Sequence, residues 1–425
     1  MDSDIVDSSG SEDCSFDALV RLQRLHDSYP FLDTIGNEDL DDIQNMTNAN
    51  WKVLGKYIAE KHNLQEVRLS KGALNDLRMI HLFRGLKRSN SIKQLLLYEN
   101  ALSIAGLQSM EPFLHNAHNL RTLDISRNNL QSEGFNFLFR ALHNIPIEEL
   151  NCSECGIESI EIDRDYIPKN LKALELAKNI INADGYRGLA TLLEWEDTTL
   201  NLLNICFSKI DDHRLTILVN ALKKNTSLKI LLLAGHDISD RGRIMLLKLV
   251  NDISSIKATL QSNHTLINIL VELFLKDEIQ QQISIALDIN KTEDSPEAAS
   301  IEKVFRTQLS RGLRAKMAAI QGIDHSVYSE IDYLHLPEVL SLIGQNLGQE
   351  ELFVALKSTI MGLLSTVDLK KCIQQERDLY VAKIAEYKIK VEELDAKLAT
   401  MEEAANEETE DRDSKRRRCD GGALG

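Results

Sequence analysis

The chain has 425 residues, of which 43 % are hydrophobic and 5 % aromatic, and its net charge is −16 at pH 7. This hydrophobic content indicates a folded chain with a large core. The acidic balance excludes broad nucleic-acid binding unless a local basic face compensates, because phosphate groups repel an acidic surface. No apolar run approaches the length of a membrane-spanning helix, so we expect no membrane span.

The N-terminal 63 residues precede the regular part of the sequence. Residues 1–17 contain six acids and no Lys or Arg, and we expect them to be disordered. They lack the basic-then-apolar order of a secretory signal, so we expect an intracellular protein whose six scattered cysteines are reduced. Residues 18–63 predict a helical N-terminal cap, with an apolar stripe running from Trp51 to Ile58.

Residues 64–289 repeat one pattern seven times. Apolar residues stand at the first, fourth and sixth positions, and a polar residue usually follows three positions later. The clear copies start at Ile92, Leu120, Leu171 and Leu200, and fainter copies start at Leu64, Ile147 and Leu228. Successive starts are 24 to 29 residues apart. A period of this length predicts a solenoid, because stacked units share a core that no single unit can bury.

Each unit predicts a strand followed by a helix. The first, fourth and sixth residues point inward from the strand, and the residues between them point outward. The second half of the unit has helical spacing, with an early glycine where a side chain would crowd the backbone. The polar residue that closes the strand motif is expected to bond backbone groups at the turn. These residues are Asn100, Asn128, Cys155, Asn179, Ser208 and His236.

These repeats resemble leucine-rich repeats of the ribonuclease-inhibitor type, over roughly residues 64–272. The resemblance implies an α/β solenoid with a curved parallel sheet inside and helices outside, which builds a surface and implies no chemical step. The arrangement of the whole chain is also similar to uncharacterised algal leucine-rich proteins with a helical tail and a terminal Ser-Lys-Arg-Arg-Arg, here Ser414–Arg418. That second resemblance supplies no activity.

Two units depart from the pattern. In the 24-residue unit from Ile147, the alternation at 157–162 and the following Pro168 predict an extended segment instead of a helix. After Leu228 the next strand motif starts 38 residues later, at Leu266. We expect the insertion near residues 253–263 to lengthen the preceding helix or its loop, and residues 272–289 to be the start of a helical C-terminal cap.

Beyond the repeats we expect an all-α C-terminal domain. Residues 290–300 predict a polar linker, residues 301–366 a helical region and residues 367–405 one long helix. The apolar seam of that helix indicates a short coiled coil, formed by Ile384, Tyr387, Val391, Leu394, Leu398 and Met401. Two alternatives stay open, a homodimer through this seam or a single helix packed on its own domain. Residues 406–425 are expected to be a disordered tail.

Few residues suggest chemistry. Cys152 and Cys155 form a CxxC, but both occupy structural positions of the repeat, and zinc would need two further ligands. His115 and His118 have no acidic partner at metal-site spacing. Phosphate-loop, nucleophile-elbow and zinc-protease motifs are absent from the sequence. We therefore expect a protein that is not an enzyme, with no cofactor and no metal.

The outward strand positions give the candidate binding residues. The first units are polar with one aromatic, and the units from Leu200 and Leu228 are apolar. An apolar surface in a place expected to be wet indicates that something covers it, either a protein partner or the chain's own C-terminal helices. The residues selected for binding on the concave face are Tyr98, Asp124, Glu149, Asn151, Glu175, Leu202, Ile230 and Leu232.

The C-terminal tail carries a basic cluster, Lys415, Arg416, Arg417 and Arg418, which is either a nuclear import signal for an import receptor or a solvated charge run. The function predicted from the sequence is an intracellular protein-interaction scaffold, in the nucleus or the cytoplasm. One alternative is a regulator of a small GTPase, because the layout resembles the activating proteins of the nuclear-transport GTPase, in which a similar repeat type is followed by an acidic tail. The other alternative is an acidic nuclear chaperone.

Overall fold

The structure, a computed structural model, describes residues 34–37, 40, 46–235, 238–271 and 277–308, and isolated positions between 377 and 397. The chain divides into two compact units, Met1–Ser326 and Val327–Gly425. The described positions of the second unit are helical and exposed, Val391 among them. The rest of the predicted coiled coil, the acidic N-terminus and the basic cluster at 415–418 lie outside the described residues.

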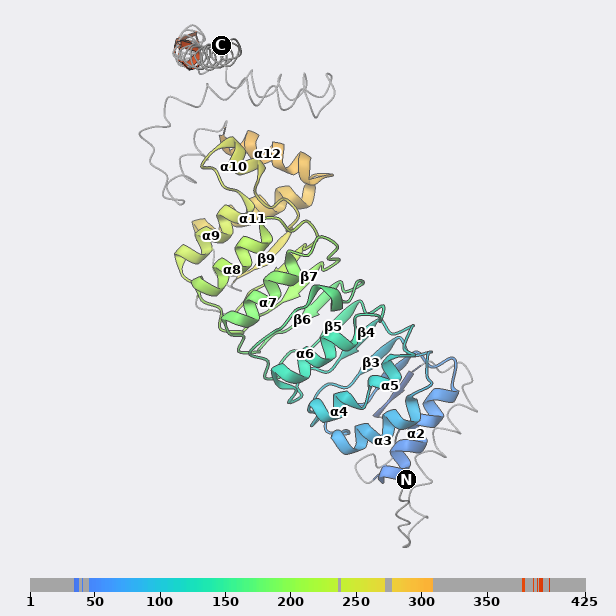
Figure 1. Cartoon of the computed structure of the whole chain (residues 1–425). Coiled ribbons are helices and arrows are strands. Elements are labelled where there is room, and N and C mark those ends of the chain that lie inside the picture. Colours follow the sequence, from blue (N-terminus) through green and yellow to red (C-terminus); the bar gives the residue numbers. More distant parts are fainter. Residues whose placement is uncertain are drawn as a thin grey trace, which may run out of the picture. The chain divides into compact units, whose positions relative to one another are not determined.

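Over the described residues, the repeats form one sheet of nine parallel strands in chain order (Figure 1). Each described strand has three residues, and its middle residue is buried and aligned with the middle residues of its neighbours. The predicted α/β solenoid is therefore confirmed. The strands are β1 (Thr34–Gly36), β2 (Glu66–Arg68), β3 (Gln94–Leu96), β4 (Thr122–Asp124), β5 (Glu149–Asn151), β6 (Ala173–Glu175), β7 (Leu202–Asn204), β8 (Ile230–Leu232) and β9 (Asn268–Leu270).

Helices cover one side of this sheet (Figure 1). The repeat helices are α2 (Asn48–Glu60), α3 (Asp76–Leu86), α4 (Ile104–Gln108), α5 (Glu111–Leu114), α6 (Gln131–Ala141), α7 (Ala183–Leu193), α8 (Asp212–Leu222) and α9 (Asp240–Val250). A short helix η3 (Arg164–Tyr166) replaces a full helix after β5. At the C-terminal end stand α10 (Ile256–Leu260), α11 (Glu278–Thr292) and α12 (Pro296–Gln308).

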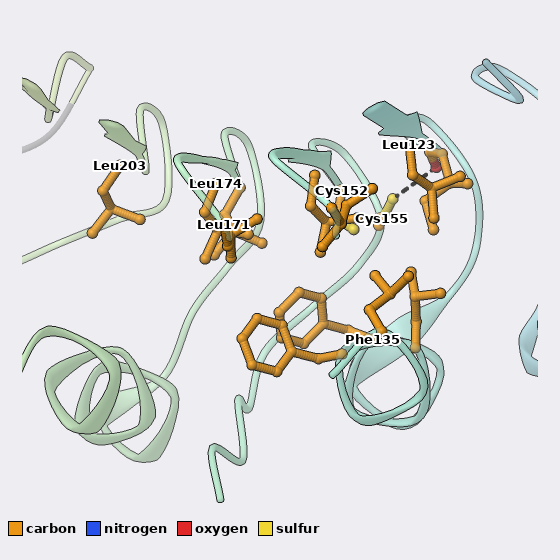
Figure 2. Close-up of a cluster of buried hydrophobic side chains, with 14 of the residues drawn as sticks. Leu123, Phe135, Cys152, Cys155, Leu171, Leu174 and Leu203 are labelled. Atoms are coloured by element: carbon orange, nitrogen blue, oxygen red, sulfur yellow. Dashed lines mark hydrogen bonds between the residues drawn. The ribbon is translucent and has the colours of Figure 1, made fainter. Parts of the chain in front are cut away.

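Leucine side chains from the strands and phenylalanines from the helices fill the space between the two layers. Figure 2 shows Leu123, Leu174 and Leu203 pointing from the strands toward the helix layer, with Phe135 on a helix of that layer. All four are fully buried. Burying one such side chain stabilises the fold by about 1.5–3 kcal/mol, and the register repeats this contribution in every unit.

The polar residues that close the strand motif bond the backbone, as predicted. Asn128 donates to Leu97 O and Ile125 O and accepts from Leu102 N–H, so it joins two consecutive units. Asn179 likewise donates to Cys152 O and Leu176 O and accepts from Cys155 N–H. These bonds satisfy backbone groups inside the turn that water cannot reach. His236 lies outside the described residues.

The sequence prediction is wrong about the first repeat. Residues 18–63 were expected to form a helical cap, but β1 lies in this range and pairs with β2. Helix α2 is therefore the helix of an additional repeat. The pattern missed this unit because Asn37 stands where other units have an inward apolar residue. Asn37 instead donates to Ser70 O and accepts from Ser70 N–H, which ties the first repeat to the second.

The C-terminal end also differs from prediction. The insertion forms the separate helix α10, whereas a longer α9 or a longer loop was expected. The predicted linker at 290–300 is wrong as a domain boundary, because these residues belong to α11, a short connection and α12. Pro296 begins α12, a position where its missing N–H costs nothing. The boundary between the compact units falls at 326–327.

The unit after β5 has the extended segment that its sequence predicts. Ser132 Oγ accepts from Glu158 N–H and Ser159 N–H, and Asn136 Oδ1 accepts from Glu161 N–H. On the other side Gly188 lets α7 approach closely, because a Cβ there would lie 2.0 Å from Ile160 O. Side chains of α6 thus replace the hydrogen bonds that a helix would have supplied to this segment.

Candidate functional site

The face of the sheet that the helices leave uncovered, here called the open face, is the predicted concave face. The outward strand positions lie on it in two rows, one through Thr122 and the other through Asp124. Backbone hydrogen bonds continue the pairing one step beyond the strands, for example from Glu99 N to Ser126 O, and add a third row. All eight predicted binding residues lie in these rows: Tyr98, Asp124, Glu149, Asn151, Glu175, Leu202, Ile230 and Leu232.

Three acids occupy the open face on consecutive strands, Asp124 on β4, Glu149 on β5 and Glu175 on β6. Asp124 accepts from Ser126 N–H at 2.9 Å, Glu149 from the Thr122 hydroxyl at 3.3 Å, and Glu175 from the Asn204 amide at 2.5 Å. Within the described part of the chain, none of the three carboxylates forms an ion pair. The open face thus carries negative charge that no neighbouring cation balances.

The acids just beyond the ends of the strands, here called edge acids, behave differently. Glu148 lies 2.6 Å from Lys172 and 3.6 Å from Arg121, and Glu154 lies 2.8 Å from Lys178 and 3.4 Å from Arg127. A hydrogen bond from Lys172 lowers the pKa of Glu148, and one from Lys178 lowers the pKa of Glu154. Glu148 and Glu154 are therefore already paired, as is Glu66 with Arg68 on β2, whereas Asp124, Glu149 and Glu175 remain available to a partner's cation.

Next to the acids the open face becomes apolar. Leu202, Ile230, Leu232 and Leu270 are half-buried at outward positions of β7, β8 and β9. Phe207, just beyond β7, is 52 % exposed. Its ring lies against the backbone of Gly235, where an added Cβ would stand 2.2 Å from Phe207 Cδ1. These five residues are called the apolar end below.

The sequence did not reveal a ridge of left-handed residues along one edge of the open face. In seven described units the residue seven positions after the start of the motif has positive φ: Lys71, Glu99, Arg127, Glu154, Lys178 and Phe207, with Gly235 in the seventh. Arg127 bridges Glu99 at 3.8 Å and Glu154 at 3.4 Å, so charges of opposite sign alternate along the ridge. Gly235 was the available signal, because glycine favours this conformation and shares the register position of the others.

The cysteine pair takes the structural positions predicted for it. Cys152 and Cys155 are buried free thiols, and Cys155 Sγ donates to Ile125 O at 3.3 Å, the dashed line in Figure 2. Burial raises the pKa of Cys155 to about 12 and raises that of Cys152 well above its usual value. Neither sulfur is a thiolate at neutral pH, so neither is a reactive nucleophile.

His115 and His118 line a hollow of about 440 Å³ on the helix side, next to His143 and Tyr166. His115 Nδ1 donates to Glu111 O and His143 Nδ1 to Arg140 O. Each ring therefore bonds a backbone carbonyl in the last turn of the helix that precedes it. The structure does not bring this hollow together with the open face. Among the described residues, no helix has the length and apolar content needed to cross a membrane.

The chain is similar to known repeat proteins. A family model described as "Leucine Rich repeat" matches residues 116–135 and 224–247. Ribonuclease inhibitor of Sus scrofa is 27 % identical over 240 residues, covering 54 % of this chain and 51 % of that protein. Ribonuclease inhibitor of Mus musculus is 25 % identical over 271 residues, covering 62 % and 57 %.

A third relative, NACHT, LRR and PYD domains-containing protein 13 of Homo sapiens, is 27 % identical over 166 residues, covering 36 % of this chain and 15 % of that protein. The chain thus spans little more than half the length of the two inhibitors it matches. The resemblance inferred from the repeats is confirmed by these similarities and by the sheet of parallel strands.

Proposed function

Because the chain is a leucine-rich-repeat protein of the ribonuclease-inhibitor type, we propose that it binds a protein partner through its open face and performs no catalysis itself. The observation that carries this proposal is the contrast between the acids of the edge and those of the open face. Asp124, Glu149 and Glu175 lie on consecutive strands and form no ion pair with any described residue, and the strand of Glu175 pairs with β7, where the apolar end begins. Two of the relatives are named as ribonuclease inhibitors, that is, as proteins that act on another protein.

The open face indicates the chemistry of the partner. A Lys or Arg of the partner would find three carboxylates on adjacent strands, which raises the association rate and fixes the orientation. Apolar side chains of the partner would remove Leu202, Ile230 and Leu232 from water, which supplies most of the affinity. The proposed partner therefore presents a basic group beside an apolar patch.

The proposal is tested by comparing two exposed apolar sites. Partners are captured from the source cell with the native chain, and their affinities are then measured for a double variant, Ile230→Lys with Leu232→Lys. The matched control is Leu77→Lys, which changes a leucine that is 53 % exposed on α3. We expect the double variant to bind at least about 30-fold more weakly, since each lysine would be buried without a counter-charge, and the control to bind as the native chain does. Binding that survives the double variant would place the interface elsewhere.

Two alternative functions predict different results when salt is added to the complex or when nucleotide hydrolysis is measured. An acidic chaperone would hold a basic partner mainly by charge, so moderate salt would dissociate the complex, whereas apolar contacts would persist. A GTPase regulator would accelerate nucleotide hydrolysis at catalytic amounts of the chain, whereas a scaffold binds in stoichiometric amounts. Nuclear entry through Lys415–Arg418 and pairing through residues 367–405 remain separate proposals.

A further inference from the structure

The C-terminal end contains a lysine that no solvent reaches. Lys303 on α12 is 0 % exposed. Its Nζ donates to Val250 O at 2.6 Å, lies 3.2 Å from His264 Nδ1 and is 3.5 Å from Asn263 O. These acceptors are all neutral, and among the described residues no carboxylate lies within ion-pair distance of this amine. A buried lysine held by neutral acceptors is unusual, because burial of an ammonium is costly without a counter-charge.

The tautomer of His264 follows from its other contact. His264 Nε2 lies 3.3 Å from Leu260 O, and a carbonyl oxygen only accepts, so Nε2 carries the proton. The lone pair of Nδ1 therefore faces Lys303 and accepts from it. A second proton on His264 would occupy Nδ1, remove this acceptor and set two cations 3.2 Å apart.

The acceptors lie in or beside the one long insertion of the repeats. The interval from β8 to β9 is 38 residues, against 24 to 32 for the other intervals between neighbouring strands. The inserted loop, residues 251–265, contains α10, Asn263 and His264. Thr259 Oγ1 donates to Asp252 O, and Asn263 Nδ2 donates to Leu222 O and Asn225 O, which holds the loop in place. The extra residues thus build a receptor for a side chain of α12.

We propose that Lys303 and the loop 251–265 form a proton-gated latch that fastens α12 to the last repeat and releases it on acidification. The apolar residues Ala299, Ile301 and Val304 of α12 are also buried, so the closed latch seals apolar surface at the end of the solenoid. Opening of the latch exposes that apolar surface and releases the C-terminal end of α12 from the last repeat.

The direction of the pH dependence follows from both groups. Burial lowers the pKa of Lys303 to about 7, and burial with the Lys303 charge lowers the pKa of His264 to about 4. In the open state both groups return to their usual values, so the open state binds more protons. Stability of the closed latch therefore falls as pH drops from about 10.5 to 7 through Lys303, and again from about 6.5 to 4 through His264.

Other charged groups surround the latch without contacting the amine of Lys303. Glu302 and Arg306 of α12 pair with each other at 2.6 Å, and Glu297 of α12 acts on His264. The adjoining elements carry Lys248 on α9, Asp252 in the loop, Lys257 on α10, and Asp288 and Lys291 on α11. Among the described residues, the titratable group that forms a hydrogen bond with Lys303 is His264.

The test is backbone hydrogen exchange in the full chain at pH 8.5, 7.0 and 5.5, corrected for intrinsic rates. Amides of α7, in the middle of the solenoid, serve as the internal reference. We expect the protection of α12 to fall by about 100-fold or more between the two extremes, relative to α7. In Lys303→Met the change between pH 8.5 and 7.0 should vanish. In His264→Asn, which keeps an oxygen near the Nδ1 position, the change below pH 7 should vanish.

Lys257→Met, which removes an exposed lysine of α10, is the control and should retain the native profile. The latch is refuted if protection of α12 in the native chain does not depend on pH, or if Lys303→Met keeps the native dependence. Should Lys303→Met leave α12 unprotected at every pH, His264→Asn still decides. Loss of the low-pH change supports the latch, and its persistence refutes it.

Discussion

The two ends of the solenoid are held by different chemistry. At the N-terminal end α2 packs on α3 with the backbones in contact, because a Cβ on Gly55 would lie 2.1 Å from Leu82 O and one on Gly85 would lie 2.5 Å from Lys52 O. Trp51, Leu54 and Ile58 of α2 are fully buried. The C-terminal end is rich in buried polar side chains, namely Asn251, Thr259, Asn263, Gln282, Asn290, Ser300, Lys303 and Thr307.

This difference sets how each end responds to its surroundings. Apolar burial depends little on pH or salt, so the first repeats are expected to stay closed under most conditions. A polar contact is held by specific donors and acceptors, and its strength changes when one of them gains or loses a proton. We therefore expect the N-terminal end to stay closed as pH changes, and the hold on the C-terminal end to depend on pH.

The largest expected effect tests whether the two ends share one core. Leu174 is fully buried at the centre of β6, between the two ends. Leu174→Asp would place an unpaired charge there and should destabilise the protein by more than about 4 kcal/mol. Thermal unfolding followed by circular dichroism measures the loss. A variant that melts with the native chain would show that the register of the repeats is wrong.

The second effect tests the N-terminal end of the solenoid, where α2 packs on α3. Trp51 is 0 % exposed, and the Arg78 guanidinium lies 5.8 Å from its ring centre. Trp51→Ala should cost about 3–4 kcal/mol, because it leaves a large cavity between α2 and α3. Val53→Ala, on the same helix but 47 % exposed, is the control and should change stability by less than about 0.5 kcal/mol. Equal losses in the two variants would remove the contrast with the C-terminal end.

The third effect compares one histidine from each end. Burial, with Arg84 and Lys52, lowers the pKa of His81 on α3, and burial with Lys303 lowers that of His264 to about 4. Both protonate more readily when unfolded, so stability present above pH 6.5 is lost as pH falls toward each folded pKa. His264→Asn should remove on the order of 2 kcal/mol of this loss between pH 7.5 and 4.5. His81→Asn should remove much less, because His81 is only partly buried. Melting curves at both pH values measure the pH dependence of stability in each variant. If His264→Asn and His81→Asn reduce that dependence equally, the expected difference between the two ends is wrong.

The sequence predicted the parts of the molecule that follow from a repeated apolar pattern. Inward leucines, closing asparagines and the rows of the open face depend on local register, so the sequence was enough to predict which face the eight proposed binding residues lie on. The first repeat was missed because Asn37 replaces an apolar residue and bonds Ser70 instead. The C-terminal end was predicted poorly for the same kind of reason. Lys303 and its acceptors are 39 to 53 residues apart in sequence, and no periodicity connects them.

The smallest expected effect concerns the two ion pairs of Arg243, one within α9 and one that joins α9 to the cap of α11. Arg243 on α9 has an 8 % exposed side chain and pairs with Asp240 on its own helix and with Asp277, the residue that caps α11. Arg243→Met keeps most of the apolar volume but leaves Asp277 without its cation, so we expect a loss of about 1–2 kcal/mol. This loss should be confined to the C-terminal end, where exchange of the α11 amides reports it.

Arg187→Met is the matched control, because Arg187 and Asp184 form a pair of the same spacing on α7 with both side chains more than half exposed. An exposed pair contributes at most about 0.5 kcal/mol, since water screens the charges and competes for their hydrogen bonds. If both variants lose the same small amount, the Arg243 pairs are no stronger than surface pairs, and the conditional hold on the C-terminal end rests on the Lys303 contacts alone. If instead Arg243→Met also speeds exchange in α2 and α3, the two ends are coupled through the shared core and do not open independently.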